Sequence, residues 1–90
     1  MTNISQFSKH CGITVTGQYR VTANMSVWSN THNKMVQKVE LSDHTGTCKA
    51  CVRWEHREYA QNLPVQMVIE AQITPKCLNG SVIGGLIENW

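Results

Sequence analysis

Apolar and polar residues alternate along much of this chain, and the alternation predicts β-strands. The clearest case runs from Ile13 to Trp28, where a period of two residues places successive side chains on opposite faces. One face carries Tyr19, Val21, Ala23, Met25 and Val27, and the other carries Arg20, Thr22, Asn24 and Ser26. Gly17 interrupts the pattern, and a glycine inside a strand indicates a bulge or a sharp bend. We therefore expect a long first strand that bends near Gly17.

Two further alternating segments, Met35–Leu41 and Thr47–Trp54, predict a β-hairpin. The turn between them contains Asp43, whose carboxylate can accept hydrogen bonds from backbone amides, and Gly46, which can adopt the positive φ of a type I turn closed by a G1 bulge. The alternation then gives the hairpin one apolar face and one basic face. The apolar face carries Val39, Leu41, Cys48, Ala50 and Val52, and the basic face carries Lys38, Glu40, Lys49, Cys51 and Arg53.

The second half of the chain predicts a short helix and two more strands. Residues 55–62 tolerate a helix of one or two turns, which ends at Asn62-Leu63-Pro64 because proline disfavours helix continuation. A fourth strand covers Val65–Ile73, and a fifth covers Ser81–Trp90 after an Asn79-Gly80 turn. The residues expected to point inward from the fourth strand are Val65, Met67, Ile69, Ala71 and Ile73. Gly84-Gly85 allows a bend in the fifth strand.

The order of these elements predicts an all-β fold. A long bent strand, a hairpin, a helical segment and a second hairpin follow one another in the order of the OB-fold, a five-stranded Greek-key barrel with a short helix between strands 3 and 4. At 90 residues the chain is expected to form one domain, covering 13–90. Residues 1–12 have no clean period and predict a flexible, loosely held N-terminal arm, in which Phe7 is the residue suited to docking on the barrel.

The turn sequence also resembles a known family. Leu41–Thr47, read as L-S-D-H-T-G-T, is similar to the L-x-D-x-T-G turn of nucleic-acid-binding OB domains of the replication-protein, anticodon-binding and exoribonuclease-associated kinds. The similarity extends more loosely over Gly17–Trp90, including Asn79-Gly80. The resemblance implies that single-stranded DNA or RNA binds across the exposed face of strands 2 and 3, between the loop that joins strands 1 and 2 and the loop that joins strands 4 and 5.

Several positively charged residues and one tryptophan match that expected binding surface. The candidate nucleic-acid-binding residues are Arg20, Trp28, Lys34, Lys38, Lys49, Arg53 and Lys76. The lysines and arginines can follow phosphates, and an accessible Trp28 can stack on a base. Because the net charge is only +2, any attraction to nucleic acid must come from the placement of these residues rather than from bulk charge. The alternative interpretation is that they keep a small sheet dissolved and protect its edges.

The four cysteines, Cys11, Cys48, Cys51 and Cys77, could bind a metal ion or form disulfides. No segment is long enough to span a membrane, and the N-terminus lacks the apolar stretch of a signal peptide, so we expect an intracellular, cytoplasmic protein with free thiols. Cys48 and Cys51 form a C-x-x-C pair, but residues three apart in a strand point to opposite faces, which argues against a shared metal ion or a redox pair. We therefore expect no metal and no cofactor.

The remaining aromatic and histidine residues predict core packing rather than catalysis. Trp54 and Trp90 are expected to cap the barrel ends, while Tyr19 and Tyr59 are expected to pack in or beneath the core. No nucleophile, base or phosphate-binding motif is recognisable, so we expect a protein that is not an enzyme.

Three functions remain open at this point. Non-catalytic binding of single-stranded nucleic acid is favoured. An OB-type protein-interaction or oligomerisation module within a nucleic-acid-processing complex is the main alternative, because Val68 and Val82 would be exposed. Oligosaccharide binding or a structural metal role is the third.

Overall fold

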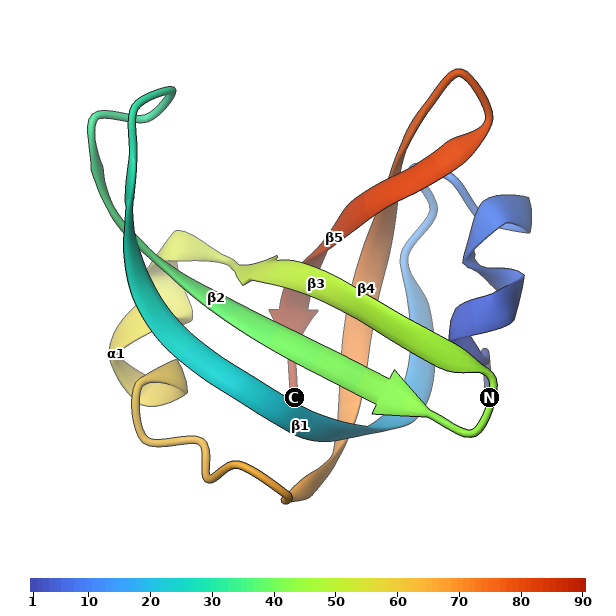
Figure 1. The fold of residues 1–90 in the computed structure, drawn as a ribbon, viewed down its shortest axis with the longest axis horizontal. Coiled ribbons are helices and arrows are strands. Elements are labelled where there is room, and N and C mark those ends of the chain that lie inside the picture. Colours follow the sequence, from blue (N-terminus) through green and yellow to red (C-terminus); the bar gives the residue numbers. More distant parts are fainter.

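The computed structural model describes residues 1–90, which form a closed five-stranded barrel (Figure 1). The order of strands around the barrel is β1-β2-β3-β5-β4. The strands are β1 (Val15–Ser29), β2 (Lys34–Asp43), β3 (Gly46–Val52), β4 (Val68–Leu78) and β5 (Ser81–Asn89). A short helical segment, η2 (Trp54–His56) followed by α1 (Arg57–Ala60), joins β3 to β4. The predicted all-β, OB-like barrel with a helix between strands 3 and 4 is confirmed.

Alternating side chains from all five strands fill the barrel. Neighbouring strands pair antiparallel, except β3 and β5, which pair in parallel from Ala50↔Gly85 to Val52↔Ile87. The strands supply most of the buried apolar cluster through Tyr19, Val21, Val39, Leu41, Cys48, Ala50, Val52, Ile69, Ala71, Ile73 and Ile87. The predicted apolar face of the β2–β3 hairpin is therefore confirmed. No helix in the structure has the length and apolar character needed to cross a membrane.

The sequence suggested a bulge or bend at Gly17, but the bulge in β1 lies at Thr22. Gly17 pairs regularly with Ala71 of β4, whereas the pairing of β1 with β2 shifts between Val21↔Leu41 and Ala23↔Glu40. Gly17 has a different role, since any Cβ there would collide with the Tyr19 hydroxyl. The absence of a side chain at Gly17 lets the Tyr19 ring lie across the strand.

The bulge reverses which residues of β1 face outward. Before it, Tyr19 and Val21 point into the core, but after it Ala23, Met25 and Val27 pair with the outward residues Glu40, Lys38 and Val36. The prediction that these five residues share one face is therefore wrong, because one extra residue in a strand inverts the alternation beyond it. The residues that now point inward are polar: Asn24 and Ser26 both hydrogen-bond with the buried side chain of Gln37.

The β2–β3 turn is organised by Asp43, as predicted. Its carboxylate accepts hydrogen bonds from the N–H groups of Thr45 and Gly46, at 2.8 and 3.1 Å, and from the Thr45 hydroxyl. The positive φ expected at Gly46 is absent, because Gly46 is the first residue of β3 and pairs directly with Asp43. The turn closes through the side chain of Asp43 and needs no left-handed glycine.

The first twelve residues pack against the barrel instead of forming a loose arm. Residues Ile4–Lys9 form a 3-10 helix, η1, and Phe7 is fully buried with its ring edge toward Tyr19. The Tyr19 hydroxyl donates a 2.8 Å hydrogen bond to the carbonyl of Thr2, and burial, the largest cause, together with Asp43 and Cys48 raises its pKa to about 12. The docking expected for Phe7 is confirmed, whereas periodicity did not predict the 3-10 helix around it, because a single buried side chain leaves no repeat.

A disulfide links Cys11, which follows η1, to Cys77 of β4, with a Cα–Cα distance of 5.7 Å. The expectation of four free thiols is thus wrong for these two residues, which lie 66 positions apart in the chain. Cys48 and Cys51 are free. Cys48 is buried and Cys51 is half-buried on the other face of β3, so the opposite orientation predicted for this pair is confirmed.

Several aromatic and apolar residues lie farther outside than the sequence suggested. Tyr59 is 74% exposed on α1, and Trp54 lies on the surface, so neither packs in the core. Trp90 is partly buried against the core and contacts His56 edge to face, which agrees with its predicted capping role. Val65 and Met67 are exposed because they precede β4, which begins at Val68.

The geometry around Asp43 predicts how stability depends on pH. Burial acts to raise the pKa of this carboxyl, but the hydrogen bonds from Thr45, Ile4 and Gly46 outweigh it and hold the pKa below its ordinary value of 3.8. Since the folded-state pKa is depressed, the stabilisation is complete above pH 3.8 and is lost as the pH falls through the lower folded-state value.

We expect Asp43→Asn to lower the free energy of unfolding by about 1–2 kcal/mol at pH 7, because it removes charge-assisted hydrogen bonds. Urea unfolding followed by circular dichroism at pH 7 and at pH 2.5 measures this. The difference from the parent protein should shrink at the lower pH. Glu70→Gln changes an exposed carboxylate without a salt bridge or hydrogen bond and is the control; an equal loss in both variants would contradict the assignment.

Candidate functional site

A basic groove runs across the outer face of β1, β2, β3 and the β4–β5 hairpin. Two adjoining hollows form it, and Lys38 and Lys49 line both. One hollow lies toward β1 and includes Met25, Val27 and Glu40. The other lies toward the β4–β5 hairpin and includes Lys76 and Ile83. We call this surface the lysine groove and define it by Met25, Val27, Lys38, Lys49, Cys51, Lys76, Ile83 and Gly84.

Strand pairing explains why these side chains meet. Met25 of β1 pairs with Lys38 of β2, and Lys38 pairs in turn with Cys51 of β3. Directly paired residues point to the same face of a sheet, so the row continues across three strands. Lys49 lies next to this row, opposite Glu40. The row reaches β1 only because the bulge at Thr22 turned Met25 outward.

The β4–β5 hairpin forms the far wall of the lysine groove. Lys76 pairs with Gly84, and the register of the hairpin shifts immediately afterward, between Lys76 and Cys77. Ile83 lies at this irregularity and is 66% exposed. A Cβ at Gly84 would lie only 3.2 Å from the carbonyl oxygen of Lys49. The glycine therefore lets β5 approach β3 and leaves the floor of the groove without a side chain.

The three lysines of the groove form no salt bridge. The salt bridges of the structure are Arg53–Glu55, Arg53–Glu88 and Arg57–Glu58, and none includes Lys38, Lys49 or Lys76. Glu40 is the acidic residue that lines the groove, and its Oε1 accepts a 2.8 Å hydrogen bond from the Thr22 hydroxyl on β1. The groove therefore presents free ammonium groups beside the apolar side chains of Met25, Val27 and Ile83.

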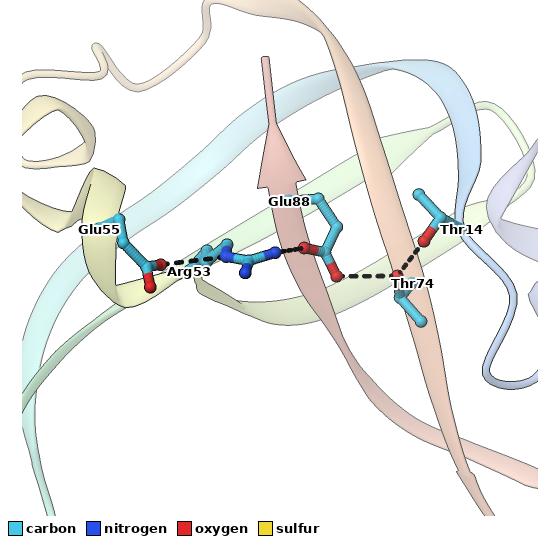
Figure 2. Close-up of polar contacts among 5 residues, drawn as sticks. All are labelled: Thr14, Arg53, Glu55, Thr74 and Glu88. Atoms are coloured by element: carbon cyan, nitrogen blue, oxygen red, sulfur yellow. Dashed lines mark hydrogen bonds and ion pairs between the residues drawn. The ribbon is translucent and has the colours of Figure 1, made fainter.

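Arg53 does not lie in the lysine groove, although strand alternation predicted it there. Figure 2 shows its guanidinium held between two carboxylates, 3.0 Å from Glu55 and 2.8 Å from Glu88. The chain of contacts continues from Glu88 to the hydroxyl of Thr74 and from there to Thr14. The hydrogen bond that Arg53 donates to Glu88, followed by the one that it donates to Glu55, raises the pKa of Arg53. The side chain of Arg53 ties the end of β3 to β5, and the two carboxylates compensate its charge.

The structure also separates Arg20, Lys34 and Trp28 from the lysine groove. Arg20 donates a 2.8 Å hydrogen bond to the carbonyl of Gln66 and shares a shallow surface with Asp43 and His44. Lys34 lies over the ring of Trp54, with its Nζ 3.9 Å from the ring centroid.

Trp28 follows the bulge on the same face as Asn24 and Ser26, opposite the face of Met25 and Val27. It is 55% exposed near the end of the β1–β2 hairpin. Of the predicted site residues, Lys38, Lys49 and Lys76 are thus brought together, and Arg20, Trp28, Lys34 and Arg53 are not.

Sequence reasoning missed the apolar part of the lysine groove. Regular alternation places Met25 and Val27 on the same face as Tyr19 and Val21, and it does not reveal the bulge that turns them outward. Ile83 was missed because Val82 was expected to be the exposed residue, whereas Val82 packs partly against the core. Gly84-Gly85 was the signal that could have pointed here, since paired glycines in a strand often mark a close approach of backbones.

No protein-family model, curated protein or solved structure matches this chain. No group of three or more His, Cys, Asp or Glu side chains converges in the structure. The lysine groove offers positive charge, apolar contact area and one thiol, which suits the binding of an extended anion with apolar parts.

The different burial of the two free cysteines, Cys48 and Cys51, can be tested by thiol labelling. We expect native, non-reduced protein to take up one equivalent of N-ethylmaleimide, at Cys51, because Cys48 is buried and burial raises the pKa of its thiol. Intact-mass spectrometry and peptide mapping measure the adduct. Cys51→Ser should abolish native labelling, and unfolding in guanidinium should expose Cys48. Equal labelling of both thiols in the native state would contradict the described packing of β3.

Proposed function

We propose that this protein binds single-stranded nucleic acid, DNA or RNA, without catalysing a reaction on it. The observation that carries the proposal is the gathering of Lys38, Lys49 and Lys76, all free of ion pairs, around one groove with apolar walls. A single strand offers what such a groove can take: phosphates for the ammonium groups and unstacked bases for the apolar side chains.

The architecture supports a path for the strand across the barrel. The β1–β2 and β4–β5 hairpins both project beyond the barrel toward the top of Figure 1, with β2 and β3 between them. Neighbouring strands lie about 4.8 Å apart, so a chain that crosses β1, β2 and β3 meets a new strand at each step. OB barrels that bind oligonucleotides use this face and these two loops.

The composition of the lysine groove indicates the type of affinity. No aromatic side chain lines it, so base stacking, which gives other single-strand binders about 1–3 kcal/mol per base, contributes little. Phosphate contacts then dominate, and binding should be tolerant of sequence and sensitive to salt. Three phosphate contacts correspond to a slope of about −2 in a plot of log affinity against log salt concentration, because each contributes about 0.7 for single strands.

An intracellular location belongs to the same proposal, because a nucleic-acid ligand is found inside cells. The disulfide Cys11–Cys77 is an unusual feature for that location.

A protein-interaction or oligomerisation function is the second candidate, and exposed apolar residues favour it. Met25 is 51% exposed, and Trp28 and Met35 are also exposed on the β1–β2 hairpin where it extends beyond the barrel. Val68, predicted to be exposed, is so, whereas Val82 is partly buried. Multi-angle light scattering separates the two functions: an oligomer that ignores oligonucleotides supports the second, and a monomer that binds them supports the first.

The placement of charge can be tested with two variants of equal net charge. We expect Lys49→Glu to weaken binding of a fluorescein-labelled dT20 oligonucleotide at least about tenfold and to reduce the salt slope, since it removes a phosphate contact and adds repulsion. Lys9→Glu makes the same change of charge at an exposed residue of η1 that lines neither hollow, and is the control. Fluorescence anisotropy across a salt series measures both. Equal losses in the two variants, or binding by Lys38→Glu/Lys49→Glu/Lys76→Glu, would overturn the proposed groove.

A further inference from the structure

The disulfide Cys11–Cys77 joins the N-terminal segment to the wall of the lysine groove. Cys11 follows η1 and is exposed, and Cys77 is half-buried in β4, one residue after Lys76. A backbone hydrogen bond next to the disulfide, from the N–H of Gly12 to the carbonyl of Pro75 at 2.8 Å, joins the same two segments. The disulfide therefore connects a part of the molecule outside the groove to the residues that shape the groove.

The tip of the β4–β5 hairpin, residues 77–83, has few other attachments. The ladder is interrupted between Lys76 and Cys77, and only the pairs Cys77↔Val82 and Leu78↔Ser81 lie beyond the interruption. Leu78 and Ile83 are both more than half exposed, which leaves Val82 as the apolar contact of the tip with the core. Short ladders with little buried apolar surface open readily. The disulfide is thus a main restraint on the hairpin tip with Ile83, whereas Lys76, next to it, is also held by its pairing with Gly84.

The N-terminal segment, in contrast, is held by many contacts besides the disulfide. Phe7 is fully buried, the N–H of Thr2 donates to the carbonyl of Thr16 at 2.8 Å, and the N–H of Ile4 donates to Asp43 at 2.9 Å. Cleavage of the disulfide would leave these contacts in place. The hairpin tip is therefore the part that gains freedom, while the barrel and η1 stay folded.

We propose that reduction of the Cys11–Cys77 disulfide releases the hairpin tip and weakens ligand binding in the lysine groove, so that binding depends on the redox state. This proposal rests on the proposed function of the groove. The reductant is a dithiol: one of its thiolates attacks a sulfur of the disulfide, and its second thiol resolves the mixed disulfide. The protein gains two thiols, and the dithiol becomes a disulfide, so two electrons and two protons are transferred.

The direction of the effect follows from preorganisation. In the oxidised protein, the hairpin tip that carries Ile83 beside Lys76 is already ordered, so the ligand does not have to order it on binding. In the reduced protein the ligand must do so, which lowers affinity. The exposure of Cys11 gives a dithiol access to the bond. Disulfides inside cells are usually transient and redox-sensing, which fits an intracellular protein that carries an accessible one.

Two measurements on the full chain test the proposal. Amide hydrogen exchange of residues 77–84 compares the oxidised protein with the same protein treated with dithiothreitol, and anisotropy with labelled dT20 compares their affinities. We expect faster exchange of these amides and about a five- to tenfold loss of affinity on reduction, with an unchanged circular dichroism spectrum. Cys11→Ser/Cys77→Ser should behave like the reduced protein and should not respond to dithiothreitol.

Each other outcome is decisive. Equal protection of residues 77–84 in both redox states overturns the proposal, whether or not an oligonucleotide binds. Faster exchange with unchanged affinity overturns the link between the hairpin tip and the groove. Loss of the folded spectrum on reduction would assign the disulfide a purely structural role and also overturn the proposal. If the oxidised protein binds no oligonucleotide, the proposed function fails, and the exchange experiment alone then decides whether the disulfide restrains the tip.

Discussion

The bulge at Thr22 is the constraint on which both the barrel and its outer surface depend. Before it, β1 pairs with β4 up to Arg20 and fills the core through Tyr19 and Val21. After it, β1 pairs with β2 alone and turns Met25 and Val27 outward. Hydrogen bonds from the Thr22 hydroxyl to the carbonyl and to the carboxylate of Glu40 hold the extra residue in place. One strand can thereby serve two halves of a closed sheet, which a regular alternation would not permit.

The bulge also turns polar side chains of β1 toward the interior at one end of the barrel. The helical segment between β3 and β4 supplies hydrogen-bond partners for them. Asn24 donates to the carbonyls of Ala60 and Leu63, at 2.7 and 3.0 Å, and accepts from Gln37. The N-terminal helical segment η1 lies at the opposite end (Figure 1), and its Phe7 is fully buried. Two short segments thus close the two ends of the barrel, and no buried side-chain nitrogen or oxygen is left without a partner. Because both segments cover the ends, the outer face of β2 and β3 stays free.

The sequence was sufficient wherever a local rule applied and failed where distant partners decided the outcome. Period-two alternation identified the strands, the Asp43 turn and the shared face of Lys38 and Lys49. It did not identify the bulge, because Thr22 has no local feature that distinguishes it from the alternating residues around it. Arg53 was misplaced for a related reason: its partner Glu88 is 35 residues away, and alternation does not report ion pairs between strands. The docking of η1 and the Cys11–Cys77 bond likewise depend on contacts far apart in the chain.

The distribution of acidic residues explains how a chain with a net charge of only +2 presents a basic groove. Asp43 is directed into its turn, while Glu55 and Glu88 share Arg53. Glu58 lies beside Arg57 on the surface of the helical segment. Glu40 alone reaches the groove, where the Thr22 hydroxyl holds it on the β1 side. Since exposed charges act over about 10 Å at moderate salt, the potential at Lys38, Lys49 and Lys76 is set by these near neighbours rather than by the total charge.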